Sequence, residues 1–175
     1  MKRTKKEAAH GHRINRAAKV GSVPFADVFL GFEEVEAVRS IFLDQTEEIL
    51  ADLMVDILPR SGYLRVDDQT GRIVVSSEYL RTGDERYLYL DVVHELVHIK
   101  QFMDGRELFD RRYSYVDRQT EIEAYAAAVK EARRIGMKEE QMVEYLRVEW
   151  VTEEEFQRLL RAVGVEAKPK PDSSQ

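Results

Sequence analysis

Two histidines and a glutamate stand at a spacing that can bind a metal ion and use it. His94-Glu95-Leu96-Val97-His98 matches the pattern H-E-x-x-H. Positions i and i+4 of a helix project from one face, one turn apart, so both imidazoles can reach one Zn²⁺ ion at about 2.0–2.1 Å. Glu95 then lies beside the metal, where its carboxylate can take a proton from a water that the metal activates. The motif predicts His94 and His98 as zinc ligands and Glu95 as the catalytic base.

The third ligand must come from elsewhere in the chain. Zinc hydrolases usually supply three protein ligands and leave a fourth position for water. The other histidines, His10 and His12, lie in a basic N-terminal segment, and the chain has no cysteine. We therefore expect a carboxylate from a following helix. Glu121 and Glu123 are two residues apart in a segment with a helical pattern, so only one of them can face the metal.

The motif and the downstream glutamates together resemble a zinc peptidase family. Over about residues 63–130, the chain is similar to gluzincins, and in particular to small metallopeptidases of the ImmA/IrrE kind. Glu121 opens an E-I-E-A sequence that resembles the turn carrying the third ligand in several such families. The resemblance implies Glu121 as the third ligand, with Glu123 as the alternative. The chain departs from the family pattern at Tyr125, where Asp is usual, and at Val97, where Gly is common.

Four other polar side chains are candidates for supporting roles. Asp91 stands one helical turn before His94 and could accept a hydrogen bond from that imidazole, which would hold its tautomer. Tyr113, Tyr115 and Tyr125 could each donate a hydrogen bond to a developing oxyanion. The competing interpretation is an ordinary helix carboxylate and three packing tyrosines.

These residues predict an enzyme: zinc-dependent hydrolysis of peptide bonds in a peptide or protein substrate, with Glu95 as general base. The alternative is a catalytically silent, zinc-binding regulatory or interaction protein of the same fold. A carboxylate-bridged di-iron protein would need two E-x-x-H elements on the helices of one bundle, and between residues 24 and 166 the chain has only the one that ends at His98.

The hydrophobic pattern predicts the elements that position the motif. We expect an α+β, minimal zincin-like domain, in which a small sheet packs on a buried site helix and the C-terminal part is mostly helical. The expected helices cover residues 32–57, 85–102, 117–135, 138–147 and 153–163, and the expected strands cover 63–66 and 72–76 around a turn at 67–71. Thr152 and Glu155 match a capping box before the last helix.

Charge divides the 175-residue chain. Its net charge is −6, yet residues 1–19 hold seven Lys or Arg against one Glu. We expect a flexible basic arm over 1–23, one domain over 24–166 and a disordered tail over 167–175. The arm could make weak contacts with nucleic acid or an acidic partner through residues 1–19, or serve only to solubilise the chain. No apolar run reaches the length of a membrane span and no signal peptide is recognisable, which makes a cytoplasmic location the expectation.

Overall fold

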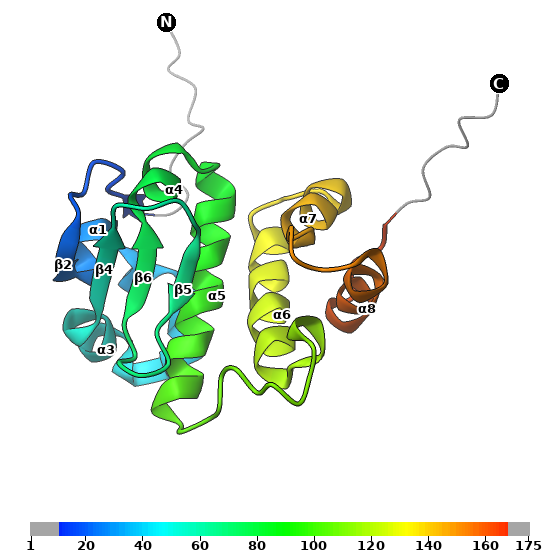
Figure 1. The fold of residues 1–175 in the computed structure, drawn as a ribbon. Coiled ribbons are helices and arrows are strands. Elements are labelled where there is room, and N and C mark those ends of the chain that lie inside the picture. Colours follow the sequence, from blue (N-terminus) through cyan, green and yellow to red (C-terminus); the bar gives the residue numbers. More distant parts are fainter. Residues whose placement is uncertain (1–10, 168–175) are drawn as a thin grey trace, which may run out of the picture.

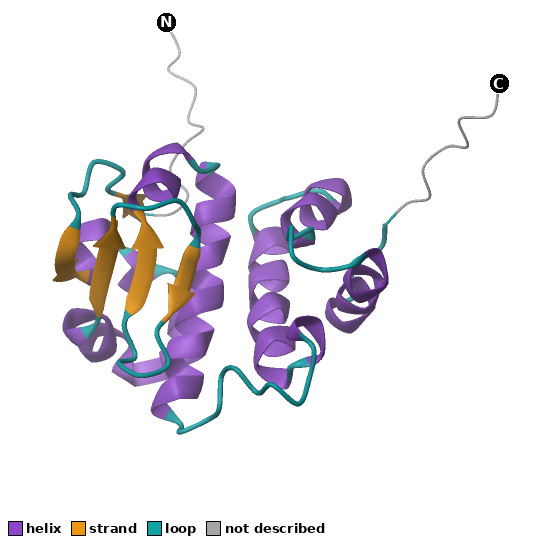
Figure 2. Cartoon of the chain, viewed as in Figure 1, coloured by secondary structure: helices purple, strands orange, loops and turns teal. Residues whose placement is uncertain are grey.

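The computed structural model describes residues 11–167, and this part of the chain is α+β. A small sheet lies on one side of the long helix α5 (Glu85–Met103), and the C-terminal helices lie on the other side (Figure 1). All the strands precede α5 in the sequence, so the strands and the C-terminal helices are segregated (Figure 2). The strands are β1 (Arg13–Ile14), β2 (Gly21–Pro24), β3 (Phe29–Leu30), β4 (Met54–Leu58), β5 (Leu64–Val66) and β6 (Ile73–Ser76). The other helices are α1 (Phe25–Val28), α2 (Glu36–Phe42), α3 (Thr46–Asp52), α4 (Ser77–Thr82), α6 (Gln119–Arg134), α7 (Glu139–Leu146) and α8 (Glu153–Val163), with 3₁₀ turns at Phe32–Glu34, Leu43–Gln45 and Tyr115–Asp117.

The main sheet has the strand order β2-β4-β6-β5. Strands β4 and β6 are parallel and central, and the two outer pairs are antiparallel. Val55 lies opposite Ile73 and Ile57 opposite Val75, and all four side chains are buried. These β-branched side chains suit a central strand. The sheet ends in β2 on one side and in β5 on the other, and β5 lies against α5.

The predicted hairpin of β5 and β6 is confirmed, and it is placed directly against the site helix. Asp67 Oδ1 accepts hydrogen bonds from the backbone N–H groups of Gln69 (2.9 Å) and Thr70 (3.1 Å) in the turn. Gly71 has a φ of 66°, and a Cβ at this position would lie 2.4 Å from the ring of Phe102 on α5. Glycine is therefore required where the turn meets the helix.

The prediction of one helix over residues 32–57 is wrong. The segment contains two short helices, α2 and α3, and ends in the central strand β4. The chain turns at Leu43, a non-glycine residue with a φ of 56°. In β4, Val55 and Ile57 are buried while Asp56 between them is partly exposed. This alternation has a period of two, and the pairing with β6 favours a strand where the apolar run alone was ambiguous.

The flexible arm predicted over residues 1–23 is wrong for its second half. Strand β1 pairs with β3 in a separate two-stranded sheet, and β2 pairs with β4 in the main sheet. This part of the chain therefore contributes one strand to each sheet. The guanidinium of Arg16 donates to the backbone carbonyls of Leu80 and Gly83 at the end of α4. Residues 1–10, and residues 168–175 of the predicted tail, lie outside the described part.

The predicted site helix is confirmed as α5. Asp84 caps it, because its side chain accepts hydrogen bonds from the backbone N–H groups of Arg86 (2.9 Å) and Tyr87 (3.2 Å). Gly105, with a φ of 72°, follows its end. The helix is buried on most of its surface, between the sheet on one side and α6 on the other.

The three predicted C-terminal helices are present as α6, α7 and α8. Thr152 and Glu155 form the expected capping box at the start of α8, and Gly164 ends that helix in a left-handed conformation. No helix in the described part of the chain has the length and apolar character needed to cross a membrane.

Candidate metal centre

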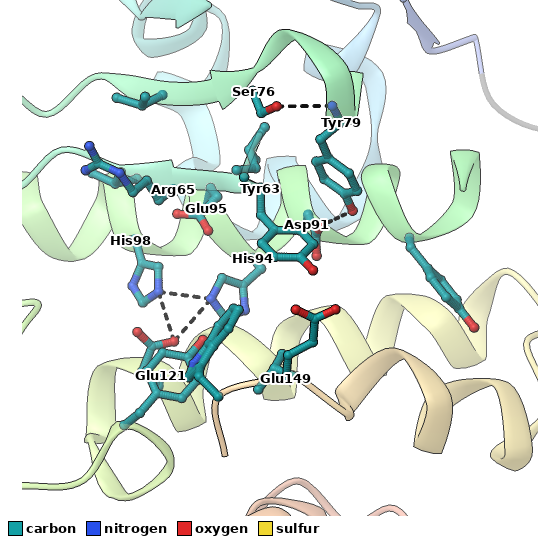
Figure 3. A pocket seen from close by; sticks show the side chains of 18 of the residues that line it. Tyr63, Arg65, Ser76, Tyr79, Asp91, His94, Glu95, His98, Glu121 and Glu149 are labelled. Carbon is teal, nitrogen blue, oxygen red and sulfur yellow. Dashed lines mark hydrogen bonds and ion pairs between the residues drawn. The ribbon is translucent and has the colours of Figure 1, made fainter. Parts of the chain in front are cut away.

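Three buried side chains from two helices converge on one point (Figure 3). His94 and His98 come from α5 and Glu121 from the first turn of α6. The Nε2 atoms of the two histidines are 3.0 Å apart. Glu121 Oε2 lies 3.3 Å from His94 Nε2 and 3.4 Å from His98 Nε2. Such a group can hold a metal ion.

The separations fit one ion with short bonds. Zinc–ligand bonds of about 2.0–2.1 Å at tetrahedral angles place the ligand atoms about 3.3–3.4 Å apart. The three observed separations are 3.0, 3.3 and 3.4 Å. Glu121 Oε2 is buried and accepts no hydrogen bond from the described residues. Because a buried carboxylate oxygen needs a partner, a cation between the three side chains would complete the site.

The two helices position these ligands through their packing. The i, i+4 spacing on α5 aligns both imidazoles on the side that faces α6. The buried face of α6 begins at Glu121 and continues through Ala124, Ala128 and Ala132. Side chains at a contact set the distance between helix axes, and these alanines are small. Glu121 therefore reaches the histidines from the neighbouring helix.

Gln101, which sequence reasoning missed as a site residue, orients His98. Its amide nitrogen donates to the Thr120 carbonyl (3.0 Å) and to Glu123 Oε2 (2.9 Å), both of which can only accept. The amide oxygen must therefore face His98 Nδ1, 2.7 Å away. In its neutral form, His98 therefore carries its proton on Nδ1, which leaves the lone pair of Nε2 to face the candidate metal position. The available signal was the i+3 spacing from His98, which puts Gln101 on the adjacent turn.

Glu123, the alternative ligand, lies outside the triad and supports it indirectly. Its carboxylate forms an ion pair with Arg106 (2.5 Å) and accepts hydrogen bonds from Gln101 and Gln119. The hydrogen bond from Arg106 is the main reason that the pKa of Glu123 lies below its usual range. Of the two carboxylates that the sequence left open, Glu121 is the one that the structure brings to the histidines.

The carboxylate of the triad is ionised and attracts positive charge. Burial lowers the pKa of His94. Burial also acts to lower the pKa of His98, but the carboxylates of Glu121 and Glu95 outweigh it and raise that pKa to about 9. The pKa of Glu121, which burial alone would raise, is held at about 2 by the two imidazoles. Glu121 is thus ionised at neutral pH and offers a negative ligand atom.

Glu95 lies beside the triad and is itself buried. It lines the same cavity as His94, His98 and Glu121 and projects toward strand β5 (Figure 3). Burial raises the pKa of Glu95 to about 8, with smaller contributions from Glu121 and Asp91, against the lowering effect of His98 and the Val66 backbone N–H. A carboxyl group with a pKa near neutrality is suited to exchanging protons, and a nearby cation would lower that pKa and favour the basic form.

Asp91 does not orient His94, contrary to the prediction. Its Oδ2 accepts a hydrogen bond from the Tyr79 hydroxyl at 2.5 Å. The Nδ1 atom of His94 is buried and has no hydrogen-bond partner among the described residues. The first turn of helix α4 brings Tyr79 to Asp91, and this contact between two elements could not be read from the spacing of Asp91 and His94.

The three candidate tyrosines separate into two positions. Tyr115 and Tyr125 line the cavity, and their hydroxyls are 2.8 Å apart in a shared hydrogen bond. The ring of Tyr125 packs edge-on against His94, with 4.3 Å between centroids. Burial raises the pKa of both tyrosines, so both stay protonated and can donate. Tyr113 is 54% exposed and is not among the residues that line the cavity.

The cavity joins these groups in a volume of about 680 Å³. Its walls come from β5, β6, α4, α5, α6 and the segment after α7, so they are assembled from distant parts of the sequence. Comparisons with protein-family models, with curated proteins and with solved structures find no match for this chain.

Proposed function

We propose that this protein is a zinc-dependent metallopeptidase of a minimal zincin-like fold, in which His94, His98 and Glu121 hold the ion and Glu95 is the general base. The observation that carries the proposal is the set of three ligand atoms at tetrahedral separations, next to a fourth, buried carboxylate that lines the same cavity. A two-histidine, one-carboxylate set is typical of zinc peptidases.

The residues around the ion divide the chemistry. When bound, Zn²⁺ supplies a Lewis acid and lowers the pKa of water in its open position. Glu95 accepts the proton of the attacking water and later passes it to the leaving amine. Either Tyr115 or Tyr125 donates a hydrogen bond to the oxyanion that develops on the scissile carbonyl, since one hydroxyl of the pair keeps a free proton.

A peptide is the substrate that the surroundings favour. Strand β5 is an edge of the main sheet, and its residues Leu64, Arg65 and Val66 line the cavity beside Glu95. An edge strand offers unpaired backbone groups to which an extended peptide can hydrogen-bond. Such pairing would hold the peptide along the site helix, with its backbone close to the metal position.

The experiment compares Glu95→Gln with the wild type and with Glu78→Gln, a matched control on the exposed side of α4. We expect about one zinc ion per chain in all three proteins. Cleavage of casein and of a mixed peptide library should fall at least about a hundredfold in Glu95→Gln alone, the scale of a lost general base.

Two outcomes would count against the proposal. If Glu95→Gln cleaved its substrates at the wild-type rate, Glu95 would not be the general base. A zinc-loaded wild type that cleaves no substrate in the library would favour the alternative, a zinc-binding regulatory or interaction protein that does not catalyse.

A further inference from the structure

The cavity continues past His94, away from His98, into a region lined by carboxylates and tyrosines. Figure 3 shows the side chains of Asp91, Glu149 and Tyr63 directed into this region. The Tyr63 hydroxyl lies near both carboxylates: after burial, Glu149 is the main cause of its raised pKa, and Asp91 adds to it. We call this part of the cavity the acidic end.

Asp91 retains capacity to bind a ligand. Its Oδ2 accepts a hydrogen bond from Tyr79. The Tyr145 hydroxyl also lies close enough to lower the pKa of Asp91. A carboxylate can accept about four hydrogen bonds, so Asp91 can still receive donors from a group in the cavity.

No cation within residues 11–167 neutralises the acidic end. Glu144 lines the cavity as well. Among the described residues, Asp91, Glu144 and Glu149 form no ion pair. Arg147, on the same wall, pairs with another glutamate at 2.8 Å and stacks on the Phe156 ring at 4.0 Å.

The two other arginines that line the cavity form no ion pair with the carboxylates of the acidic end among the described residues. Arg65 lies toward His98 at the opposite end (Figure 3), and Arg60 is exposed. The acidic end thus carries uncompensated negative charge.

A buried tyrosine hydroxyl with spare hydrogen-bonding capacity also faces this space. Tyr145 is 8% exposed and lines the cavity, and its hydroxyl has no hydrogen-bond partner among the described residues. Burial raises the pKa of Tyr145, and Asp91 raises it further through its charge and its closeness to the hydroxyl, which places the hydroxyl at the acidic end. Because burying a hydroxyl without a well-formed hydrogen bond costs free energy, a polar group of a ligand in the cavity would stabilise this hydroxyl. Tyr63, Tyr79 and Tyr87 line the same cavity, and aromatic rings can attract a cation.

We propose that the acidic end binds the side chain of a lysine or arginine in the peptide substrate, next to the scissile bond. This inference rests on the proposed function and names its substrate class. Asp91 precedes His94 by three residues, just under one helical turn, or about 4.5 Å along the axis. With the scissile carbonyl at the metal position, an adjacent long basic side chain extends along α5 to Asp91, Glu149 and the Tyr145 hydroxyl.

The test measures peptide binding separately from cleavage. Seven-residue alanine-based peptides carry lysine, arginine, norleucine or glutamate at the central position. Their affinity is measured by calorimetry on zinc-loaded, full-length Glu95→Gln, in which bound peptides are not consumed. We expect the basic peptides to bind about ten- to a hundredfold more tightly than norleucine, the range for hydrogen bonds between charged groups. The same ranking should appear in kcat/KM of the wild type.

Matched variants locate the preference. Asp91→Asn and Glu149→Gln should each reduce it at least about threefold, and Glu149→Lys should shift it toward the glutamate peptide. Glu154→Gln removes a charge of the same kind on α8, outside the cavity, and should leave it unchanged. Thermal unfolding of each variant confirms that it is folded, and Glu149→Gln provides the test if Asp91→Asn does not fold.

The outcomes separate the two proposals. Equal affinity for the lysine and norleucine peptides, a basic preference that survives the double variant of Asp91 and Glu149, or no peptide binding at all would overturn the inference. Cleavage without a preference for basic peptides would support the peptidase proposal and contradict the basic subsite. A preference for basic peptides that depends on Asp91, without cleavage by the wild type, would support the subsite and contradict the peptidase proposal.

Discussion

Gln101 offers the sharpest test of the metal centre, because it touches one ligand and cannot bind the ion in its place. Gln101→Leu keeps a similar volume and removes the hydrogen bonds to His98 Nδ1 (2.7 Å), the Thr120 carbonyl (3.0 Å) and Glu123 (2.9 Å). His98 then lacks the acceptor that holds the proton on Nδ1 and turns Nε2 toward the ion. We expect zinc affinity to fall while Glu121 and His94 remain in place.

The magnitude follows from these contacts. Loss of a residue that orients a ligand lowers metal affinity by about 10–100-fold, or about 1.4–2.7 kcal/mol. The metal-free protein should also lose about 1–3 kcal/mol of unfolding free energy, because the buried Nδ1–H of His98 is left unpaired. Gln101→Glu separates the two effects. Its carboxylate still accepts from Nδ1 and should keep zinc affinity near that of the wild type, but it faces the Thr120 carbonyl and Glu123 without a donor and should destabilise the fold.

The assay is competition for zinc against a chromophoric chelator, with denaturant unfolding in EDTA and in excess zinc. Gln119→Leu is the control, because Gln119 is exposed and hydrogen-bonds Glu123 at 3.2 Å without touching an imidazole. The stabilisation by zinc should shrink in Gln101→Leu as its affinity falls. A folded Gln101→Leu that binds zinc within about twofold of the wild type would refute the argument that Gln101 orients His98.

Two further variants test the ligand assignment and the buried carboxylate of the acidic end. Glu121→Gln should weaken zinc binding far more than Glu123→Gln in the same chelator competition, and the reverse ranking would transfer the third ligand to Glu123. Burial raises the pKa of Asp91 to about 6 from 3.8, against the hydroxyls of Tyr79 and Tyr145. Asp91 keeps its proton to a higher pH in the folded protein than in the unfolded chain. Its ionisation therefore destabilises the fold as pH rises from about 4 to about 6. In EDTA, the unfolding free energy of Asp91→Asn relative to the wild type should therefore increase by at most about 3 kcal/mol between pH 3.5 and 7, and a pH-independent difference would contradict the raised pKa.

The features that the sequence determined by itself are those set within one element or one turn. The H-E-x-x-H spacing aligns two imidazoles on any regular helix, so His94 and His98 could be paired without a fold. The capping box at Thr152 and the turn before β6 depend on neighbours a few residues away, and they are present as expected. The coarse α+β division also followed from hydrophobic periods.

The remaining features were decided by contacts between distant segments. Residues 54–58 became a strand because β6 offered a parallel partner, which an apolar run cannot indicate by itself. Glu121 rather than Glu123 meets the histidines because of how α6 is rotated against α5, and one helix pattern allows either. Asp91 joins Tyr79 from α4 for the same reason. Sequence spacing determines which side chains share a face of one helix, whereas the docking of one helix against another determines what that face meets. Here the docking brought Glu121 to the two histidines, Gln101 to Glu123, and the acidic side chains to one end of the cavity.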